Sequence, residues 1–202
     1  MASVLPDGFE MCNEFISPDI DEKAIRRDDP KEMVLAIAHA KADKAIEIIT
    51  NRKGGVKPHV IICADQVVLF GAQVREKPAS RAQAKEHLKS YGLEKVPARC
   101  TTGVVVVSGA NYDVRHDGVD VAVQHFEEIP DEICDVLLDK GEILNCAGSF
   151  VVEDPLLAPY LGSRQGEVAS IQGMPANLTR KLLLQARSSL EEASKKQRFE
   201  GR

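Results

Sequence analysis

The stretch His59-Val-Ile-Ile-Cys-Ala-Asp-Gln-Val-Val-Leu-Phe70 decides the class of fold, because it joins two apolar runs rich in β-branched residues. Such runs are typical of strands that are buried on both faces. Asp65 and Gln66 separate the two runs, so we expect the strand to be interrupted there. Gly71-Ala72 then predicts a turn into a short returning strand over 73–77.

Helical and strand patterns alternate on both sides of this stretch. Before it, residues 30–49 begin with a proline and carry apolar residues at helical spacing, which predicts one long amphipathic helix. The patterns after it predict helices over 81–91, 131–140 and 178–186, strands over 101–108 and 119–123, and two short strands within 142–173. We therefore expect the α/β class, with a mixed sheet and helices packed on its faces.

The chain of 202 residues fits one domain over 1–187, followed by a charged tail over 188–202. Ser80 and Asn177 are expected to cap helices, Gly92 to end one, and the tail to fray at its end.

The net charge of −5 argues against broad binding to nucleic acid polymers or anionic membranes. No apolar run approaches the ~20 residues of a membrane span. Five cysteines with irregular spacing predict reduced thiols in the cytoplasm rather than disulfides or a zinc site.

The best candidate for chemistry is Asp65, which stands inside an otherwise apolar strand. An unpaired buried carboxylate is costly, so such a residue is normally paired, bound to metal, or placed at a strand end that faces a cleft. An aspartate that only caps a backbone group at the strand end fits the sequence equally well.

Other charged residues are weaker candidates when each is taken alone. The three carboxylates of Asp19-Ile20-Asp21-Glu22 could hold magnesium, although a solvated acidic loop is the favoured interpretation. Lys41 and Lys77 could bind phosphate, although most isolated lysines are simply surface residues. The sequence contains no Walker motif and no G-x-G-x-x-G loop.

Seven short segments, taken together and in order, resemble the Maf family of nucleotide pyrophosphatases. The resemblance covers about residues 15–185. The segments are Ser17-Pro18-Asp19-Ile20-Asp21-Glu22, Ala40-Lys41-Ala42, Ala64-Asp65-Gln66-Val67-Val68, Glu76-Lys77-Pro78, Thr102-Gly103-Val104, Cys146-Ala147-Gly148-Ser149-Phe150 and Gly173-Met174-Pro175.

The resemblance implies a two-lobed fold with a central nucleotide cleft, and hydrolysis of a nucleoside triphosphate between its α and β phosphates. It implies that Asp65 activates water, directly or through a bound Mg²⁺ or Mn²⁺ ion. Glu22 would hold the ion together with Asp65, and Lys41 and Lys77 would neutralise the triphosphate. A site of this kind acts mainly through positioning and electrostatic stabilisation. The sequence leaves a homodimer open.

Two residues make the chain similar to the family branch that acts on 7-methyl-GTP. Gln66 follows the catalytic Asp65, and Glu153 follows the Cys146–Phe150 segment. A carboxylate at Glu153 could accept both the N1–H and the exocyclic amine of guanine. The alternatives are an exposed loop acid at Glu153 and a strand-end amide at Gln66. A dTTP/UTP pyrophosphatase or a catalytically silent nucleotide-binding protein also remains open.

The resemblance further implies an N-terminal strand and a phosphate-binding loop of the form Ser-x-Ser-x-x-Arg-Arg. The chain reaches Ser17-Pro18 without such a loop, and Arg26 is its first arginine. We therefore expect this segment to be missing, and we expect residues 1–202 to be weakly active unless Arg26 or Arg27 replaces it.

Overall fold

The computed structural model describes residues 5–12, 15–54 and 57–200, and the chain divides into two compact units. Unit 1 is built from residues 1–65, 103–119 and 176–202, and unit 2 from residues 66–102 and 120–175. The unit boundaries fall within three strands, which are β1 (Val60–Phe70), β3 (Ala98–Ser108) and β4 (Val114–Phe126). The expected α/β class with two lobes is confirmed.

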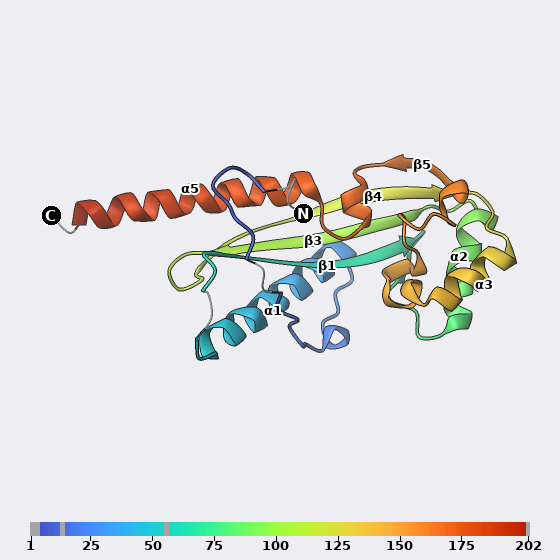
Figure 1. The fold of residues 1–202 in the computed structure, drawn as a ribbon, viewed down its shortest axis with the longest axis horizontal. Coiled ribbons are helices and arrows are strands. Elements are labelled where there is room, and N and C mark those ends of the chain that lie inside the picture. Colours follow the sequence, from blue (N-terminus) through green and yellow to red (C-terminus); the bar gives the residue numbers. More distant parts are fainter. Residues whose placement is uncertain (1–4, 13–14, 55–56, 201–202) are drawn as a thin grey trace. The chain divides into compact units, whose positions relative to one another are not determined.

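Five strands form one sheet in the order β2-β1-β3-β4-β5 (Figure 1). The short β2 (Gln73–Arg75) pairs antiparallel with β1, and β5 (Leu161–Gln165) pairs antiparallel with β4. β1 runs through Asp65 and Gln66 without a break, so the expected interruption is wrong. Both side chains have polar partners, and these partners offset the cost of placing them in a strand.

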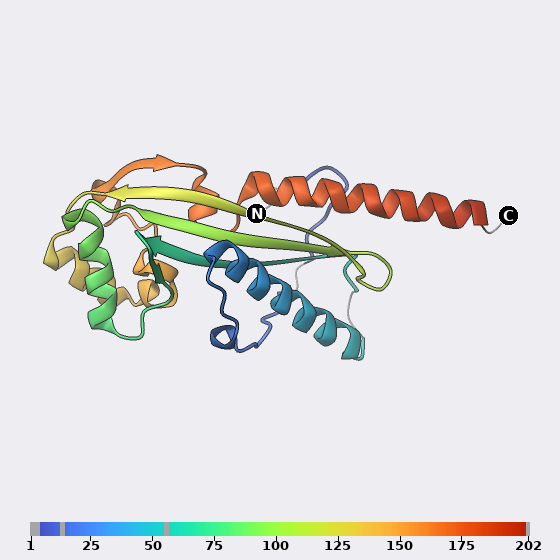
Figure 2. The same cartoon turned by 180° about the vertical axis from the view of Figure 1, so that it is seen from behind.

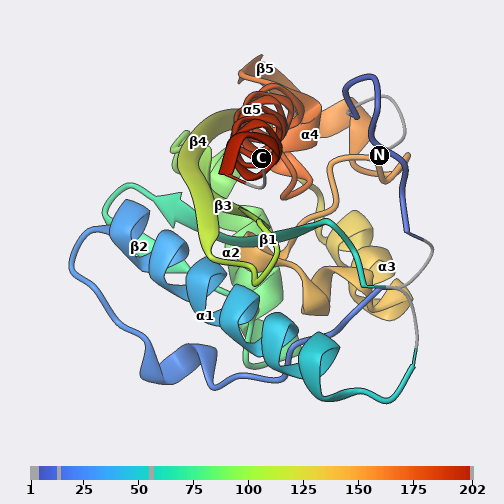
Figure 3. The same ribbon diagram turned by 90° about the vertical axis from the view of Figure 1, so that its left-hand side faces the viewer.

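In unit 1, helices α1 (Pro30–Asn51) and α5 (Ala176–Glu200) cover opposite faces of the strands (Figure 3). Val105 and Val107 of β3 pack against α1, whereas Val104 and Val106 pack against α5. Successive side chains of a strand point to opposite faces, so this one valine run supplies both cores. Asp29 caps α1 by accepting a hydrogen bond from the backbone N–H of Lys31 at 2.9 Å.

The backbone of α1 lies close against β3 at Gly103. A Cβ atom built at this glycine would lie 2.8 Å from the carbonyl carbon of Val34 and 2.9 Å from the amide nitrogen of Leu35. Both are backbone atoms, which a rotamer change cannot move. Helix and strand therefore meet here without an intervening side chain.

Helix α5 is longer than its apolar pattern predicts. It begins at Ala176 and reaches Glu200, so Asn177 lies inside the helix instead of capping it. The expected end near Ala186 is wrong, because the helix continues to Glu200. The fraying expected at the end of the tail extends to residues 201–202, which lie outside the described residues. Residues 188–200 are poor in apolar side chains, but their glutamate and lysine residues favour a helix.

In unit 2, helices α2 (Arg81–Leu93) and α3 (Asp131–Lys140) lie side by side (Figures 1 and 2). Ser80 caps α2 as predicted, because its hydroxyl accepts a hydrogen bond from the N–H of Gln83 at 3.2 Å. Gly92 lies inside α2 and does not end it. The backbone of Glu127 packs so closely there that no side chain would fit.

The rest of unit 2 differs from the expected pair of short strands in 142–173. It contains one strand, β5, together with short helical turns. These are η3 (Glu142–Asn145), η4 (Ala147–Ser149), η5 (Ala158–Tyr160) and α4 (Val168–Ile171). Positive φ angles at Gly148 and Ser149 suit tight turns and are incompatible with an extended strand. Among the described residues, no helix combines the length and hydropathy that a membrane crossing requires.

Candidate active site

Three of the predicted site residues meet in unit 1 as an ion-paired cluster. Lys41 of α1 donates a hydrogen bond from Nζ to Oδ1 of Asp65 in β1 at 2.6 Å. The same Nζ lies 2.8 Å from Oε1 of Glu22, which belongs to the helical turn η2 (Glu22–Ala24). Asp21 caps this turn by accepting from the N–H groups of Lys23 and Ala24, so the turn presents Glu22 toward Lys41.

Asp65 is buried, with 9% of its surface exposed, and is the sixth of the 11 residues of β1. Because it lies mid-strand and is paired with Lys41, the alternative of a strand-end cap is wrong. Of the three possibilities that the sequence left open for this carboxylate, the structure shows pairing, with Lys41 as the partner. Its catalytic role stays a prediction.

The charges of this cluster reinforce one another. Burial by itself lowers the pKa of Lys41, but its hydrogen bonds to Asp65 and Glu22 outweigh burial and raise the pKa above the ordinary value. Lys41 therefore stays an ammonium ion at neutral pH. The nearby Cys63 thiol has its pKa raised to about 11 by burial, against the opposing charges of Lys41 and Arg115, so it stays neutral and is a poor nucleophile.

The donor set of the cluster fits a magnesium ion in part. The two carboxylates of Glu22 and Asp65 converge on one cationic atom, which shows that both can reach a single positive centre. Mg²⁺ is often bound by one or two protein carboxylates, with water and substrate phosphate as the other ligands. Within the described residues, no group of three or more histidine, cysteine, aspartate or glutamate side chains is placed to hold a metal.

In unit 2, the amide of Gln66 is held in one orientation. Its Nε2 donates to Oγ1 of Thr102 at 2.6 Å and to the backbone carbonyl oxygen of Ser170 at 2.7 Å. A carbonyl oxygen only accepts hydrogen bonds, so the contact with Ser170 identifies the NH₂ end of the amide. The Oε1 atom of Gln66 is thus the end left to accept a hydrogen bond from a ligand.

Glu153 is exposed and accepts a hydrogen bond from Nε2 of Gln172. The next residue, Asp154, is buried and binds Nζ of Lys140 at 2.9 and 2.7 Å. Burial raises the pKa of Asp154, but the hydrogen bonds from Lys140 and from the N–H of Leu156 outweigh burial and leave it below the usual value. This ion pair fixes the turn that carries Glu153.

Lys77 is exposed on the loop that follows β2. Its charge lowers the pKa of the Cys146 thiol, which burial and then Glu153 raise, so both charged side chains act on this one thiol. The structure therefore brings Lys77 and Glu153 to the neighbourhood of Cys146. Ser170 and Gln172, which hold two of the candidate residues, carry no signal in the sequence that could have singled them out.

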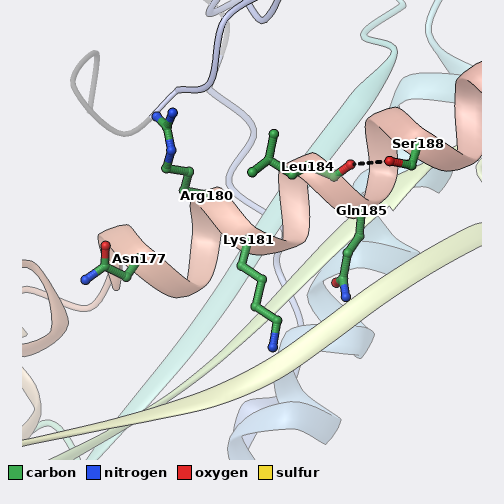
Figure 4. A pocket seen from close by; sticks show the side chains of 6 residues that line it. All are labelled: Asn177, Arg180, Lys181, Leu184, Gln185 and Ser188. Atoms are coloured by element: carbon green, nitrogen blue, oxygen red, sulfur yellow. Dashed lines mark hydrogen bonds between the residues drawn. The ribbon is translucent and has the colours of Figure 1, made fainter.

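One hollow is lined by none of the predicted site residues. It has a volume of about 420 Å³ and runs along α5. Figure 4 shows Arg180 and Lys181 on its lining projecting in different directions, so their charges do not converge on one point. The hollow is the open side of a single helix and adds nothing to the candidate active site. Its lining residues are Asn177, Arg180, Lys181, Leu184, Gln185 and Ser188.

An α/β fold that carries a buried carboxylate–lysine pair and a preset amide fits the class of hydrolases that act on phosphate anhydrides of nucleotides. Comparison with known proteins narrows this class. The sequence model of the family described as Maf-like protein matches residues 3–186, so the chain belongs to the Maf-like family.

Its relatives carry related names. The chain is 41% identical to the 7-methyl-GTP pyrophosphatase of Dictyostelium discoideum over 171 residues, which is 84% of either protein. It is 33% identical to the 7-methyl-GTP pyrophosphatase of Chromohalobacter salexigens over 151 residues, 74% of this chain and 72% of that protein. It is 29% identical to the dTTP/UTP pyrophosphatase of Symbiobacterium thermophilum over 168 residues, 83% of this chain and 80% of that protein.

These matches confirm the predicted family and the prediction of a nucleoside-triphosphate pyrophosphatase. The roles of the individual site residues stay predictions.

A Lys41→Met variant is expected to lose about 3 kcal/mol of unfolding free energy at pH 7, because it removes the Lys41 cation from its ion pair with the buried Asp65 carboxylate. Urea denaturation measures the loss. The matched control is Lys44→Met on the same helix, which breaks a more exposed pair with Glu47 and should lose less than about 1 kcal/mol. Equal losses in the two variants would show that the Lys41–Asp65 pair contributes no more to the unfolding free energy than the exposed pair does.

Proposed function

We propose that this protein hydrolyses 7-methyl-GTP to 7-methyl-GMP and pyrophosphate. The observation that carries the reaction is the buried Asp65 carboxylate, which Lys41 holds at 2.6 Å. A carboxylate fixed in this way can accept a proton from water without first reorganising its surroundings. The names of the relatives support the choice of a nucleoside triphosphate.

In the proposed reaction, the oxygen of a water molecule bonds to the α-phosphorus of the triphosphate. The bridging P–O bond breaks, pyrophosphate leaves with the bond electrons, and Asp65 takes the proton of the water. Lys41 and Lys77 offset the negative charge of the phosphates. A divalent ion, Mg²⁺ or Mn²⁺, held by Glu22 and Asp65 would add positive charge at the phosphate oxygens.

The preference for a guanine base follows from the acceptors in unit 2. Gln66 keeps its Oε1 free to accept because its NH₂ group is bound to Thr102 and Ser170. Glu153 adds a carboxylate, which is an acceptor only. Guanine offers an N1–H and an exocyclic amine, and methylation at N7 adds a positive charge that strengthens contacts with a carboxylate. Uracil and thymine offer a single ring N–H and cannot satisfy both acceptors.

A second function, pyrophosphatase activity on dTTP and UTP, is supported by the similarity to the Symbiobacterium thermophilum protein. The two functions are separated by incubating the protein with Mg²⁺ and each nucleotide while pyrophosphate is detected. We expect kcat/KM for 7-methyl-GTP to exceed that for UTP and dTTP by about tenfold or more. Better turnover of UTP or dTTP would establish the second function instead.

The same experiment identifies a silent nucleotide-binding protein. Calorimetric binding of 7-methyl-GTP without release of pyrophosphate would replace the enzymatic proposal by that alternative.

We place the protein in the cytoplasm, and the support is that all five cysteines are free thiols. Cell fractionation tests this placement.

A further inference from the structure

The segment η4, which belongs to the Cys146–Phe150 motif, is held in a strained conformation. Ser149 has a φ of 63°, in the left-handed region that non-glycine residues seldom adopt, and Gly148 before it has a φ of 71°. A residue in that region costs on the order of 1–2 kcal/mol. The surrounding structure must therefore hold Ser149 in place.

The imidazole of His87 is the group that holds it. Nδ1 of His87 lies 2.9 Å from Oγ of Ser149, and both side chains are buried. Tyr91, one turn further along α2, donates from its hydroxyl to the carbonyl oxygen of Gly148 at 3.0 Å. Two residues of one helix thus fix two consecutive residues of η4.

The backbone of His87 holds a second element. Its carbonyl oxygen accepts a hydrogen bond from Nη1 of Arg75, the last residue of β2, at 3.2 Å. Arg75 is 3% exposed, and its guanidinium carbon lies 3.7 Å from the centre of the Phe70 ring. The end of β2 is thereby anchored two residues before Lys77.

The two elements that His87 holds also bind each other next to Lys77. The N–H of Gly148 donates to the carbonyl oxygen of Glu76 at 3.3 Å. A Cβ atom at Gly148 would come within 2.8 Å of the Tyr91 hydroxyl and 2.9 Å of Cβ of Val68, so the segment has no room to shift. The backbone next to Lys77 is therefore fixed by β2 on one side and by η4 on the other.

We propose that His87 is a positioning residue for polyphosphate binding, aligning Lys77 by holding η4 through its imidazole and β2 through its carbonyl group. The inference rests on the phosphate-binding role of Lys77 in the proposed function. His87 is buried, so the proposed role does not require it to touch the nucleotide. Burial first, and the charge of Arg75 second, lower the pKa of His87 to about 4, so the imidazole is neutral at neutral pH and acts through geometry.

The test compares two variants of His87 by calorimetry in the presence of Mg²⁺. His87→Leu removes the hydrogen bond to Ser149, whereas His87→Asn keeps a polar atom near the position of Nδ1. We expect His87→Leu to bind pyrophosphate about tenfold more weakly than the unchanged protein, since small misplacements of a binding group are costly. Binding of 7-methyl-GMP should change less than about twofold, because the base contacts are untouched, and His87→Asn should restore most of the pyrophosphate affinity.

Leu137→Ala is the matched control, because Leu137 is buried in the same hydrophobic core but belongs to α3 and makes neither of the hydrogen bonds that hold η4. It should lower the melting temperature while leaving pyrophosphate binding unchanged. If His87→Leu does not fold, Ser149→Ala removes the same hydrogen bond from the other side and should weaken pyrophosphate binding in the same direction.

Three results overturn the inference: wild-type affinity for pyrophosphate in His87→Leu and Ser149→Ala, an equal loss in Leu137→Ala, or no recovery in His87→Asn. If the protein without any substitution neither binds nor hydrolyses a nucleotide, the proposed function is overturned, and the inference with it. An active protein whose His87 variants bind pyrophosphate normally would overturn the inference alone.

Discussion

An Asp65→Asn variant is expected to lose about 10²–10⁴-fold in kcat while keeping its fold, because asparagine cannot accept the proton of the attacking water. The amide oxygen can still accept the hydrogen bond that Lys41 donates, so the helix-to-strand contact survives. Pyrophosphate release under saturating nucleotide and Mg²⁺ measures the loss, and circular dichroism reports on the fold.

Asp43→Asn is the control for this variant. Asp43 lies on the same helix as Lys41 and pairs with Arg115, but it is mostly exposed. Its replacement should change kcat by less than about twofold, since exposed ion pairs contribute little. Near-normal turnover by a folded Asp65→Asn protein would remove Asp65 from the proposed chemistry.

A Glu153→Gln variant is expected to lower the preference for 7-methyl-GTP over UTP by about 10- to 100-fold, with a smaller effect on kcat. The estimate corresponds to the loss of a charged hydrogen bond, about 1.5–3 kcal/mol. Glutamine keeps the shape of the side chain but replaces one acceptor oxygen by a donor, which then faces the donors of guanine. The ratio of kcat/KM values for the two nucleotides measures the change.

Glu142→Gln is the matched control, because the charge of Glu142 also acts on the Cys146 thiol. Its replacement removes one negative charge from the same neighbourhood without touching the Glu153–Gln172 hydrogen bond. An equal change of preference in both variants would mean that net charge, and not the carboxylate of Glu153, selects the base.

The sequence predicted the buried acid but not its partner. Asp65 stood out because it interrupts an apolar run, and the physical cost of burying it predicted a partner, a bound metal or a position facing a cleft. Lys41 lies 24 residues earlier on a helix, and the contact between them depends on how α1 packs on β1. A single sequence carries no direct signal of that packing, so Asp65 and Lys41 could only be named separately.

The wrong predictions of local structure also arose because a single sequence does not show which residues pack together. The break expected at Asp65 and Gln66 was predicted from polarity alone, whereas partners supplied by α1 and by residues Thr102 and Ser170 let β1 run straight. The end of α5 was placed where the apolar residues stop, although helix propensity continues to Glu200. The turns of 142–173 depend on positive φ angles, which the composition of that segment indicates only in part.

The contact at Gly103 limits how this sequence can vary. Because α1 rests directly on the strand backbone there, the separation between helix and strand is set by two main chains and by no side chain. Lys41 lies seven residues, about two helical turns, beyond Val34 on the same rigid helix. Any side chain at Gly103 would lift α1 and lengthen the 2.6 Å contact between Lys41 and Asp65. The glycine of the Thr102-Gly103-Val104 segment therefore sets the distance between α1 and β3. A substitution at this one position would disturb the candidate active site even if every residue of the site itself were retained.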